Sequence, residues 1–246
     1  MALPKIDVPE YECILPSNKK KVRFRPFLVK EQKLLLMASE ATEIKDSVEA
    51  MKKVVKNCVL GELDVDALPV FDLEFLFLNL RARSVGEVVK VKYKCNNIIQ
   101  HSESEEEDKR CNNVVDIDIN VLEINPEFGP NHSNKIELSD KLGVVFNYPT
   151  FEMAENLNGK SENEVIFDLI VKCINYIYDD EQMYYAKDSS QEELIEFIDG
   201  LHQEHMEKIK DFFETLPKIK KEVHFDCKKC GHHEDIMIEG IQNFFV

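Results

Sequence analysis

Hydrophobic residues follow a helical period in several long blocks of the chain. In residues 46–59, Val48, Met51 and Val55 recur at intervals of three and four and mark one buried face. The block 71–87 is apolar on nearly all sides, which predicts a helix that is buried all round. The same period predicts further helices over 29–41, 161–179 and 189–217, the last of them broken near Asp199–Gly200.

Between these blocks the period changes to two, which is typical of strands with one buried face. Apolar residues alternate with lysines in 87–95 and with aspartates in 111–124. Residues 11–27 and 135–149 each predict two short strands, and the serines and acids of 96–110 predict a mobile surface loop. This order of elements predicts an α+β fold, in which helical bundle segments pack with antiparallel β hairpins.

The changes of period divide the chain into four predicted segments. Residues 1–86 combine a hairpin with helices, and residues 87–150 form a central β region with an acidic insert. Residues 151–218 are helical. Residues 219–246 form a C-terminal knuckle hairpin, which we expect to pack back on residues 87–124.

The chain has 246 residues and a net charge of −16, and its share of hydrophobic residues is ordinary for a soluble globular protein. Such acidity repels phosphate, so we expect no nucleic-acid binding without a basic patch. The cluster of Lys19–Lys21, Arg23 and Arg25 is either such a patch or a solvated hairpin whose charges prevent edge pairing. The sequence has neither an apolar run of roughly 18 to 20 residues nor a secretory pattern at its start, so we expect a cytosolic protein without membrane contact.

Seven cysteines, an odd number in a reducing compartment, argue against a disulfide framework. Three of them lie within apolar patterns and are predicted to be small core residues. These three are Cys13, Cys58 and Cys173. The other four lie at strand ends or turns, which makes them candidates for metal binding.

The stretch HFDCKKCGHHEDI, residues 224–236, places Cys227 and Cys230 in a Cys-x-x-Cys-Gly turn between two strands. This is the pattern of a zinc knuckle, in which the glycine permits a tight turn. A structural Zn²⁺ needs four protein ligands, and Cys95 and Cys111 at the ends of the central strands can supply two. The sequence therefore predicts a split zinc-ribbon-like site that ties the C-terminal hairpin to the central one, across a long acidic insert.

Two other interpretations of the four cysteines remain open. Cys227 and Cys230 form the kind of pair that thiol–disulfide oxidoreductases use, although redox pairs usually begin a helix and strands flank this one. Alternatively, all four are inert thiols. His101, His232 and His233 are either substitute ligands or turn residues in solvent.

The sequence contains none of the common catalytic motifs, such as GxxxxGK[ST], GxGxxG, HExxH or GxSxG. His202 and His205 lie three residues apart on a predicted helix and form either a metal pair or an exposed face. Asp116 and Asp118 either bind a cation or follow the alternation of a strand. We therefore predict a protein that is not an enzyme.

Four stretches taken together resemble one known family. They are VRFRPFLVKEQKLLLMA (22–38), FDLEFLFLNLRARSVGE (71–87), IYDDEQMYYAKDSSQEELIEFIDGL (177–201) and HFDCKKCGHHEDIMIEGIQNFF (224–245). The combination of RPFLVKE, LRARSVGE and CxxCG with a terminal FF is similar to the baseplate hub subunits and hub-assembly proteins of T-even-type contractile-tailed bacteriophages. The resemblance spans most of the chain, and its second cysteine pair matches more closely than its first.

The resemblance implies a role in tail morphogenesis, with phage baseplate hub proteins as partners. Members of the family are either permanent hub components or assembly chaperones that are not retained, which implies the host cytoplasm or the virion tail baseplate as the location. Arg23, Arg25, Arg81 and Arg83 are candidate partner anchors or members of internal ion pairs. The tail Phe244–Val246 either enters a partner's groove or packs on its own domain.

Overall fold

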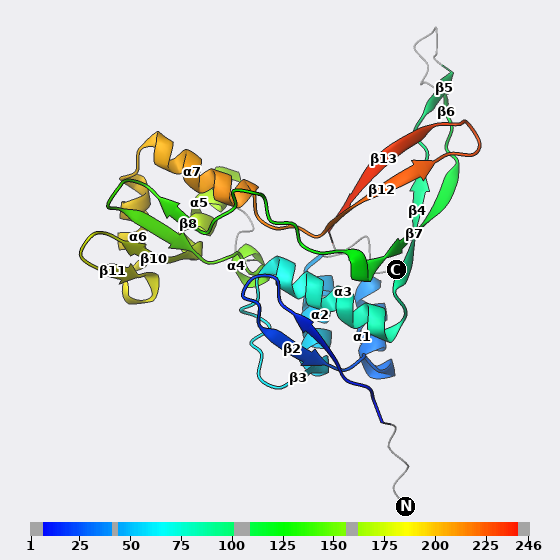
Figure 1. Ribbon diagram of the computed structural model, residues 1–246, viewed down its shortest axis with the longest axis horizontal. Helices are drawn as coiled ribbons and strands as arrows, with labels where there is room; N and C mark the ends of the chain where they lie inside the picture. The colour runs from blue at the N-terminus through cyan, green and yellow to red at the C-terminus, as the bar shows by residue number, and fades with distance from the viewer. Residues whose placement is uncertain (1–6, 41–43, 101–108, 156–161, 241–246) are drawn as a thin grey trace, which may run out of the picture.

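The computed structural model describes residues 7–40, 44–100, 109–155 and 162–240. Figure 1 shows two lobes, and a slender arm of paired strands rises from the first of them. The first lobe and the arm share one hydrophobic cluster, whose buried residues come from both ends of the chain. The second lobe has its own cluster, built from the residues between them. The combination of helices with antiparallel sheets confirms the prediction of an α+β fold.

The first lobe packs a small sheet against three helices. Its strands are β1 (Tyr11–Ile14), β2 (Lys21–Phe24) and β3 (Val59–Leu60), with β2 in the middle. Its helices are α1 (Val29–Ser39), α2 (Ile44–Cys58) and α3 (Val70–Ser84). Helix α3 is buried along most of its length, as its apolar residues on all sides predict.

Two of the sequence stretches, RPFLVKE and LRARSVGE, contact each other in this lobe. Arg25 pairs with Glu31 at 3.1 Å, and the fully buried Glu31 also accepts a hydrogen bond from the N–H of Leu28 at 2.9 Å. The N–H of Phe27 donates to the hydroxyl of Ser84 at 2.9 Å, which ties the start of α1 to the end of α3. RPFLVKE and LRARSVGE therefore encode a contact within the protein.

The basic cluster of the hairpin is paired with nearby acids. Lys21 contacts Glu12 at 2.6 Å, and Arg23 pairs with Glu10. Strand β3 covers β2 only at Arg23 and Phe24, so Lys21 lies on an open edge of the sheet. Both charged residues also pair with glutamates across the hairpin. The protection of a sheet edge by these charges stays a prediction.

The arm consists of two antiparallel hairpins. One pairs β4 (Val88–Lys94) with β7 (Val114–Asn120), and the other pairs β12 (Lys220–Asp226) with β13 (His233–Glu239). Figure 1 shows the two hairpins side by side, although they lie far apart in the sequence. One face of each hairpin is apolar, and these faces meet.

A short ladder extends the first hairpin beyond the arm. It pairs β5 (Ile98–Gln100) with β6 (Lys109–Arg110), so the segment predicted as a loop begins and ends as strands. The rest of that predicted loop, residues 101–108, lies outside the described residues. At the other end, β7 runs into the 3₁₀ turn η1 (Val121–Glu123).

The second lobe is a four-stranded sheet with helices. The strands are β8 (Lys135–Glu137), β9 (Gly143–Phe146), β10 (Ile174–Tyr178) and β11 (Met183–Tyr185), in the order β11-β10-β9-β8. The helical elements are α4 (Phe151–Glu155), α5 (Glu162–Cys173), η2 (Ala186–Asp188), α6 (Gln191–Asp199) and α7 (Gln203–Glu214). The predicted break between the last two helices is confirmed.

The helix predicted over 161–179 is wrong in its last six residues. Helix α5 ends at Cys173, and the next five residues form β10 between β9 and β11. Two isoleucines and two tyrosines in these five residues favour a strand, and the partner strands supply backbone hydrogen bonds. None of the helices within the described residues is long and apolar enough to cross a membrane.

The two lobes meet where two chain crossings run side by side (Figure 1). Glu127 on the outward crossing forms a β-bridge with Lys218 on the return, and it pairs with Lys220 at 2.9 Å. Phe71 of α3 contacts the ring of Tyr148 edge-on, with centroids 5.1 Å apart. The second lobe is therefore an insertion in the chain of the first.

Candidate metal centre

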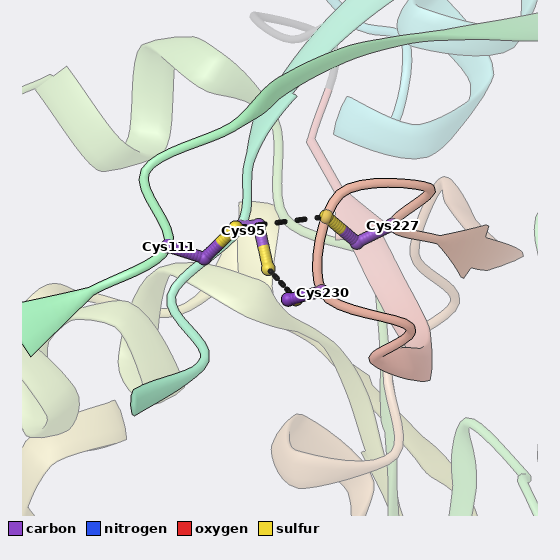
Figure 2. A group of neighbouring side chains, drawn as sticks. All are labelled: Cys95, Cys111, Cys227 and Cys230. Carbon is purple, nitrogen blue, oxygen red and sulfur yellow. Dashed lines mark hydrogen bonds between the residues drawn. The ribbon is translucent and has the colours of Figure 1, made fainter. Parts of the chain in front are cut away.

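The four predicted cysteines meet at the far end of the arm. Their sulfur atoms all lie within 4.8 Å of one another, and three of the side chains are buried while Cys230 is half-buried. The sulfurs of Cys95 and Cys230 are 3.7 Å apart, and so are those of Cys111 and Cys227. Figure 2 shows the side chains pointing toward one another from two separate hairpins.

The strand period explains why the side chains of Cys95 and Cys227 point inward. In β4 the inward positions are odd-numbered, and the count continues from Val89 and Tyr93 to Cys95. In β12 it continues from Phe225 to Cys227. Tyr93 and Phe225 pack edge to face just below the sulfurs, with centroids 4.7 Å apart. Each hairpin therefore has one cysteine that continues its buried face.

The first cysteine pair is set by a repeated tripeptide, Cys-Asn-Asn, at residues 95–97 and 111–113. The N–H of Cys95 donates to the carbonyl oxygen of Asn113 at 2.8 Å, and the N–H of Cys111 donates to that of Asn97 at 2.9 Å. These reciprocal bonds hold the two cysteines opposite each other. The long insert between them does not disturb this pairing, because it is attached beyond β5 and β6.

The second pair lies in a tight turn between β12 and β13. The N–H of Gly231 donates to the carbonyl oxygen of Cys227 at 2.8 Å, and Gly231 has a φ of 72°. A residue with a side chain would be strained in this left-handed conformation, so the glycine of Cys-x-x-Cys-Gly is needed for the turn. Lys229 in the turn donates to the carbonyl oxygen of Cys111 at 3.3 Å, which links the two knuckles.

Hydrogen bonds to the sulfurs come from the same two tripeptides. The side-chain amide of Asn97 donates to the sulfur of Cys230 at 3.6 Å, and that of Asn113 donates to the sulfur of Cys227 at 3.6 Å. Each asparagine therefore supports a sulfur of the opposite hairpin. The sequence analysis missed both residues, although the repeated Asn-Asn after each cysteine was visible.

The thiols do not ionise equally. Burial works to raise the pKa of Cys227, but the backbone N–H groups of Cys230 and Lys229 outweigh it and lower that pKa to about 6. Burial raises the pKa of the Cys95 thiol to about 12, although the N–H of Asn97 opposes it. Four adjacent thiolates need a compensating positive charge, which a bound metal cation supplies.

The sulfur geometry fits a tetrahedral metal. With metal–sulfur bonds of about 2.3 Å, as in zinc sites, two sulfurs of a tetrahedron are about 3.8 Å apart. Two of the sulfur–sulfur separations, at 3.7 Å, agree with that value, and the others do not exceed 4.8 Å. A disulfide needs about 2.05 Å between sulfurs, so these four cysteines are arranged as free thiols.

The other three cysteines are core residues, as predicted. Cys13 and Cys58 belong to the first hydrophobic cluster, and Cys173 belongs to the second. Burial raises the pKa of Cys13 and Cys58 to about 11 and that of Cys173 to about 12. None of the three belongs to the group of residues that could hold a metal ion within the described part of the chain.

The remaining metal candidates do not join a cluster. Within the described residues, the four cysteines are the group of three or more ligand-type residues close enough to hold an ion, and no histidine belongs to it. His232 and His233 lie beside the knuckle, and His232 contacts Glu234 at 3.6 Å. His202 and His205 lie near each other, with ring centroids 5.5 Å apart. His101 lies outside the described residues.

The aspartates of β7 have partners across the strand. Asp116 lies opposite Lys92, and Asp118 lies opposite Lys90, in the register of β4 and β7. Lysine beside each carboxylate disfavours a second cation there, so the alternation of a strand accounts for these residues. The outer face of the first hairpin is a row of opposite charges.

The four arginines are held inside the protein to different degrees. Arg25 and Arg81 are largely buried, the former against Glu31 and the latter donating to the carbonyl oxygen of Gly86 at 3.1 Å. Arg23 and Arg83 are more exposed, and each pairs with a glutamate of its own chain. Internal pairing thus describes all four. The tail Phe244–Val246 lies outside the described residues.

These observations define an α+β protein whose four clustered cysteines can hold a metal ion. The chain matches the family described as T4 bacteriophage base plate protein over residues 8–246, and it belongs to that family. The resemblance to baseplate proteins of T-even-type phages is therefore confirmed, and the family implies a role among the proteins of the tail baseplate. No match was found among curated proteins or solved structures.

Proposed function

We propose that this protein is a non-catalytic assembly protein of the baseplate hub, which acts by binding hub subunits in the host cytoplasm. The observation that carries the proposal is the family match over residues 8–246, since it covers both lobes and the arm together. The resemblance of the four sequence stretches to hub and hub-assembly proteins narrows the proposal from the baseplate to the hub.

We further propose that Zn²⁺ occupies the four-cysteine centre as a structural ion. Four thiolates are a common ligand set of structural zinc, and they leave no open position for a substrate. Cys95, Cys111, Cys227 and Cys230 would hold the ion, and the ion would lock the C-terminal hairpin against the central one. A zinc site of this kind has sulfur atoms about 3.8 Å apart. The two sulfur–sulfur distances of 3.7 Å in this protein are close to that value and support the choice of zinc.

Binding to hub proteins tests the first proposal. The purified protein is mixed with each hub protein of its own phage, expressed separately, and the mixtures are run on a sizing column. Co-elution at micromolar concentration is the expected result. Failure to bind any hub protein would contradict the proposal.

A permanent structural subunit of the baseplate is the second candidate. It is favoured by the same family membership, since the family is described by the baseplate itself. Quantitative mass spectrometry of purified particles separates the two. A defined copy number in every particle indicates a permanent subunit, whereas absence from the particle combined with hub binding indicates an assembly protein.

Metal analysis and thiol titration test the centre. Protein purified without added metal should contain one zinc per chain by elemental analysis, and its Cys227 should react slowly until a chelator is added. Rapid reaction of Cys227 without metal release would instead favour the thiol–disulfide oxidoreductase. The strands on both sides of the Cys-x-x-Cys pair argue against that activity.

A further inference from the structure

The sheet of the second lobe has two different faces. The register places Tyr184, Ile177 and Val144 in one cross-strand row, and the last two belong to the hydrophobic cluster beneath the helices. The adjacent row contains Tyr185 and Tyr176 and points to the opposite side. This second side takes no part in the described core of the lobe.

We call this second side the tyrosine face and define it by Tyr176, Tyr178, Met183 and Tyr185. Met183 is 56% exposed and Tyr185 is 42% exposed. The ring of Tyr176 lies 5.5 Å from that of Tyr185 and 6.4 Å from that of Tyr178. Three aromatic rings and a thioether are thus grouped on an exposed sheet face at the β11 edge.

A glycine makes room for one of these rings on the sheet. Tyr178 lies across Gly143 of the neighbouring strand, so closely that a Cβ atom at Gly143 would come within 2.6 Å of its hydroxyl oxygen and two of its ring carbons. The chain therefore leaves room for the ring on the sheet surface.

The rings already receive cations from their own chain. The ammonium group of Lys135 lies 5.0 Å from the centre of the Tyr178 ring, and that of Lys187 lies 5.4 Å from the centre of the Tyr185 ring. Such contacts arise because the face of an aromatic ring carries partial negative charge. The tyrosine face is therefore suited to positively charged groups.

The charge of the lobe favours the same kind of partner. Residues 125–218 contain 20 acidic and 8 basic residues, a net charge of −12 out of −16 for the chain. Glu181 and Asp188 are exposed at the two ends of β11, and the neighbouring Asp180 pairs with Lys141 at 2.6 Å. A basic protein surface is attracted to this lobe, whereas nucleic acid and anionic lipid are repelled.

We propose that the tyrosine face is a docking surface for an arginine- and lysine-bearing segment of another baseplate protein. The proposal rests on the proposed function only for the origin of the partner. Some cationic side chains of the segment lie over the tyrosine rings. Other cationic side chains extend beyond the rings and pair with the carboxylates beside β11. Met183 supplies an apolar contact for the stems of these side chains.

Fluorescence anisotropy with the full chain tests this surface. The probe is a labelled peptide of alternating arginine and serine, and the comparison probe has glutamate in place of arginine. We expect the arginine peptide alone to bind, and more weakly as salt rises. Tyr185→Ser should weaken binding about two- to fivefold, which is the effect of one exposed cation–π contact.

Tyr184→Ser is the matched control, because Tyr184 is also 42% exposed but lies on the other side of the same strand. It should leave peptide binding unchanged, and circular dichroism should show both variants folded. Equal weakening by the two substitutions, equal binding of the glutamate peptide, or a Met183-dependent dimer of this chain in sedimentation would overturn the proposal. None of these results bears on hub binding, which the co-elution experiment measures separately.

Discussion

The second lobe and the arm bury their apolar faces by different means. The second lobe covers one side of a four-stranded sheet with helices, and its core contains stacked rings around Phe212. The arm has two hairpins that cover each other. At its far end they are joined by the four-cysteine centre and by a few hydrogen bonds, such as those from Tyr93 to Glu234 at 2.8 Å and from Lys229 to the carbonyl oxygen of Cys111 at 3.3 Å. An isolated two-stranded hairpin is marginally stable in water.

This difference indicates where the proposed metal would contribute to the fold. The helices of the second lobe supply enough buried area to hold its sheet, so its single cysteine in the core is an ordinary packing residue. The arm has few buried residues beyond the strands themselves, and a bound ion adds a cross-link between segments more than a hundred residues apart. We therefore expect metal removal to affect the arm and leave the second lobe intact.

Loss of the metal has the largest expected effect. Cys111→Ser should abolish high-affinity metal binding and unfold the arm, since structural zinc contributes on the order of 10 kcal/mol in small zinc domains. Hydrogen exchange should show loss of protection in β12 and β13 with β9 and β10 unchanged. Cys173→Ala is the control, because that buried cysteine lies in the other lobe and should keep full metal content. Retained protection of the arm in Cys111→Ser would contradict the clamp.

Removal of an aromatic residue from the second lobe gives the reverse pattern. Phe212 is 2% exposed and packs against Phe146 and His132, so Phe212→Ala should destabilise this lobe by about 3–5 kcal/mol. Metal content should not change. Phe167→Ala serves as the control, because Phe167 is 46% exposed and should cost less than about 0.5 kcal/mol. Metal loss in Phe212→Ala would show that the lobes are not independent.

The buried ion pair of the first lobe should contribute the next largest effect. Glu31→Gln leaves Arg25 without its charge partner and should cost about 3 kcal/mol at neutral pH, as measured by urea unfolding. Burial works to raise the pKa of Glu31, but Arg25 and the N–H of Leu28 outweigh it and lower that pKa below its ordinary value. The stabilisation is therefore present above the unfolded pKa of about 4.3 and is lost as the pH falls through the lower, folded pKa.

The acid dependence provides the control for this pair. As the pH falls, the free energy of unfolding should decrease less in Glu31→Gln than in the parent protein. Both proteins should have the same metal content. Glu62→Gln, at an exposed carboxylate of the first lobe, should leave the parent's acid dependence unchanged. If Glu31→Gln does not alter the loss of stability at low pH, that loss is caused by other titratable groups.

The asparagine donors should have the smallest effect of the four. Asn97→Ala and Asn113→Ala each remove a hydrogen bond to a sulfur of the opposite hairpin, and each should lower metal affinity about tenfold. Competition with a coloured chelator measures this affinity. Asn96→Ala is the matched control, since Asn96 is exposed and adjacent. Equal affinities for all three variants would show that the asparagines do not support the centre.

Much of the fold and all four cysteines of the centre could be predicted from the sequence. The helical period located α2 and α3, and the period of two located β4 and β7, because each face buries its own regular set of residues. The same alternation placed Cys95 and Cys227 on buried faces. Cys-x-x-Cys-Gly marked one knuckle because a left-handed turn needs glycine at that position.

Local patterns failed where pairing partners decide the conformation. The stretch Ile174–Tyr178 continues an apolar block at helical spacing, but it is a strand because β9 and β11 lie on either side of it. The strands β5 and β6 were missed for a similar reason: their two or three residues gain hydrogen bonds only after the cysteines have been aligned.

The sequence by itself determined which residues are buried, where the turns fall and which side chains are able to bind a metal. Only the tertiary structure decided that Cys95 and Cys111 meet Cys227 and Cys230 within 4.8 Å, and that Asn97 and Asn113 donate across the arm. It also decided which side of the second lobe's sheet remains exposed. The physical reason is that period and turn chemistry act between near neighbours, whereas a site is assembled by packing between segments that the sequence keeps far apart.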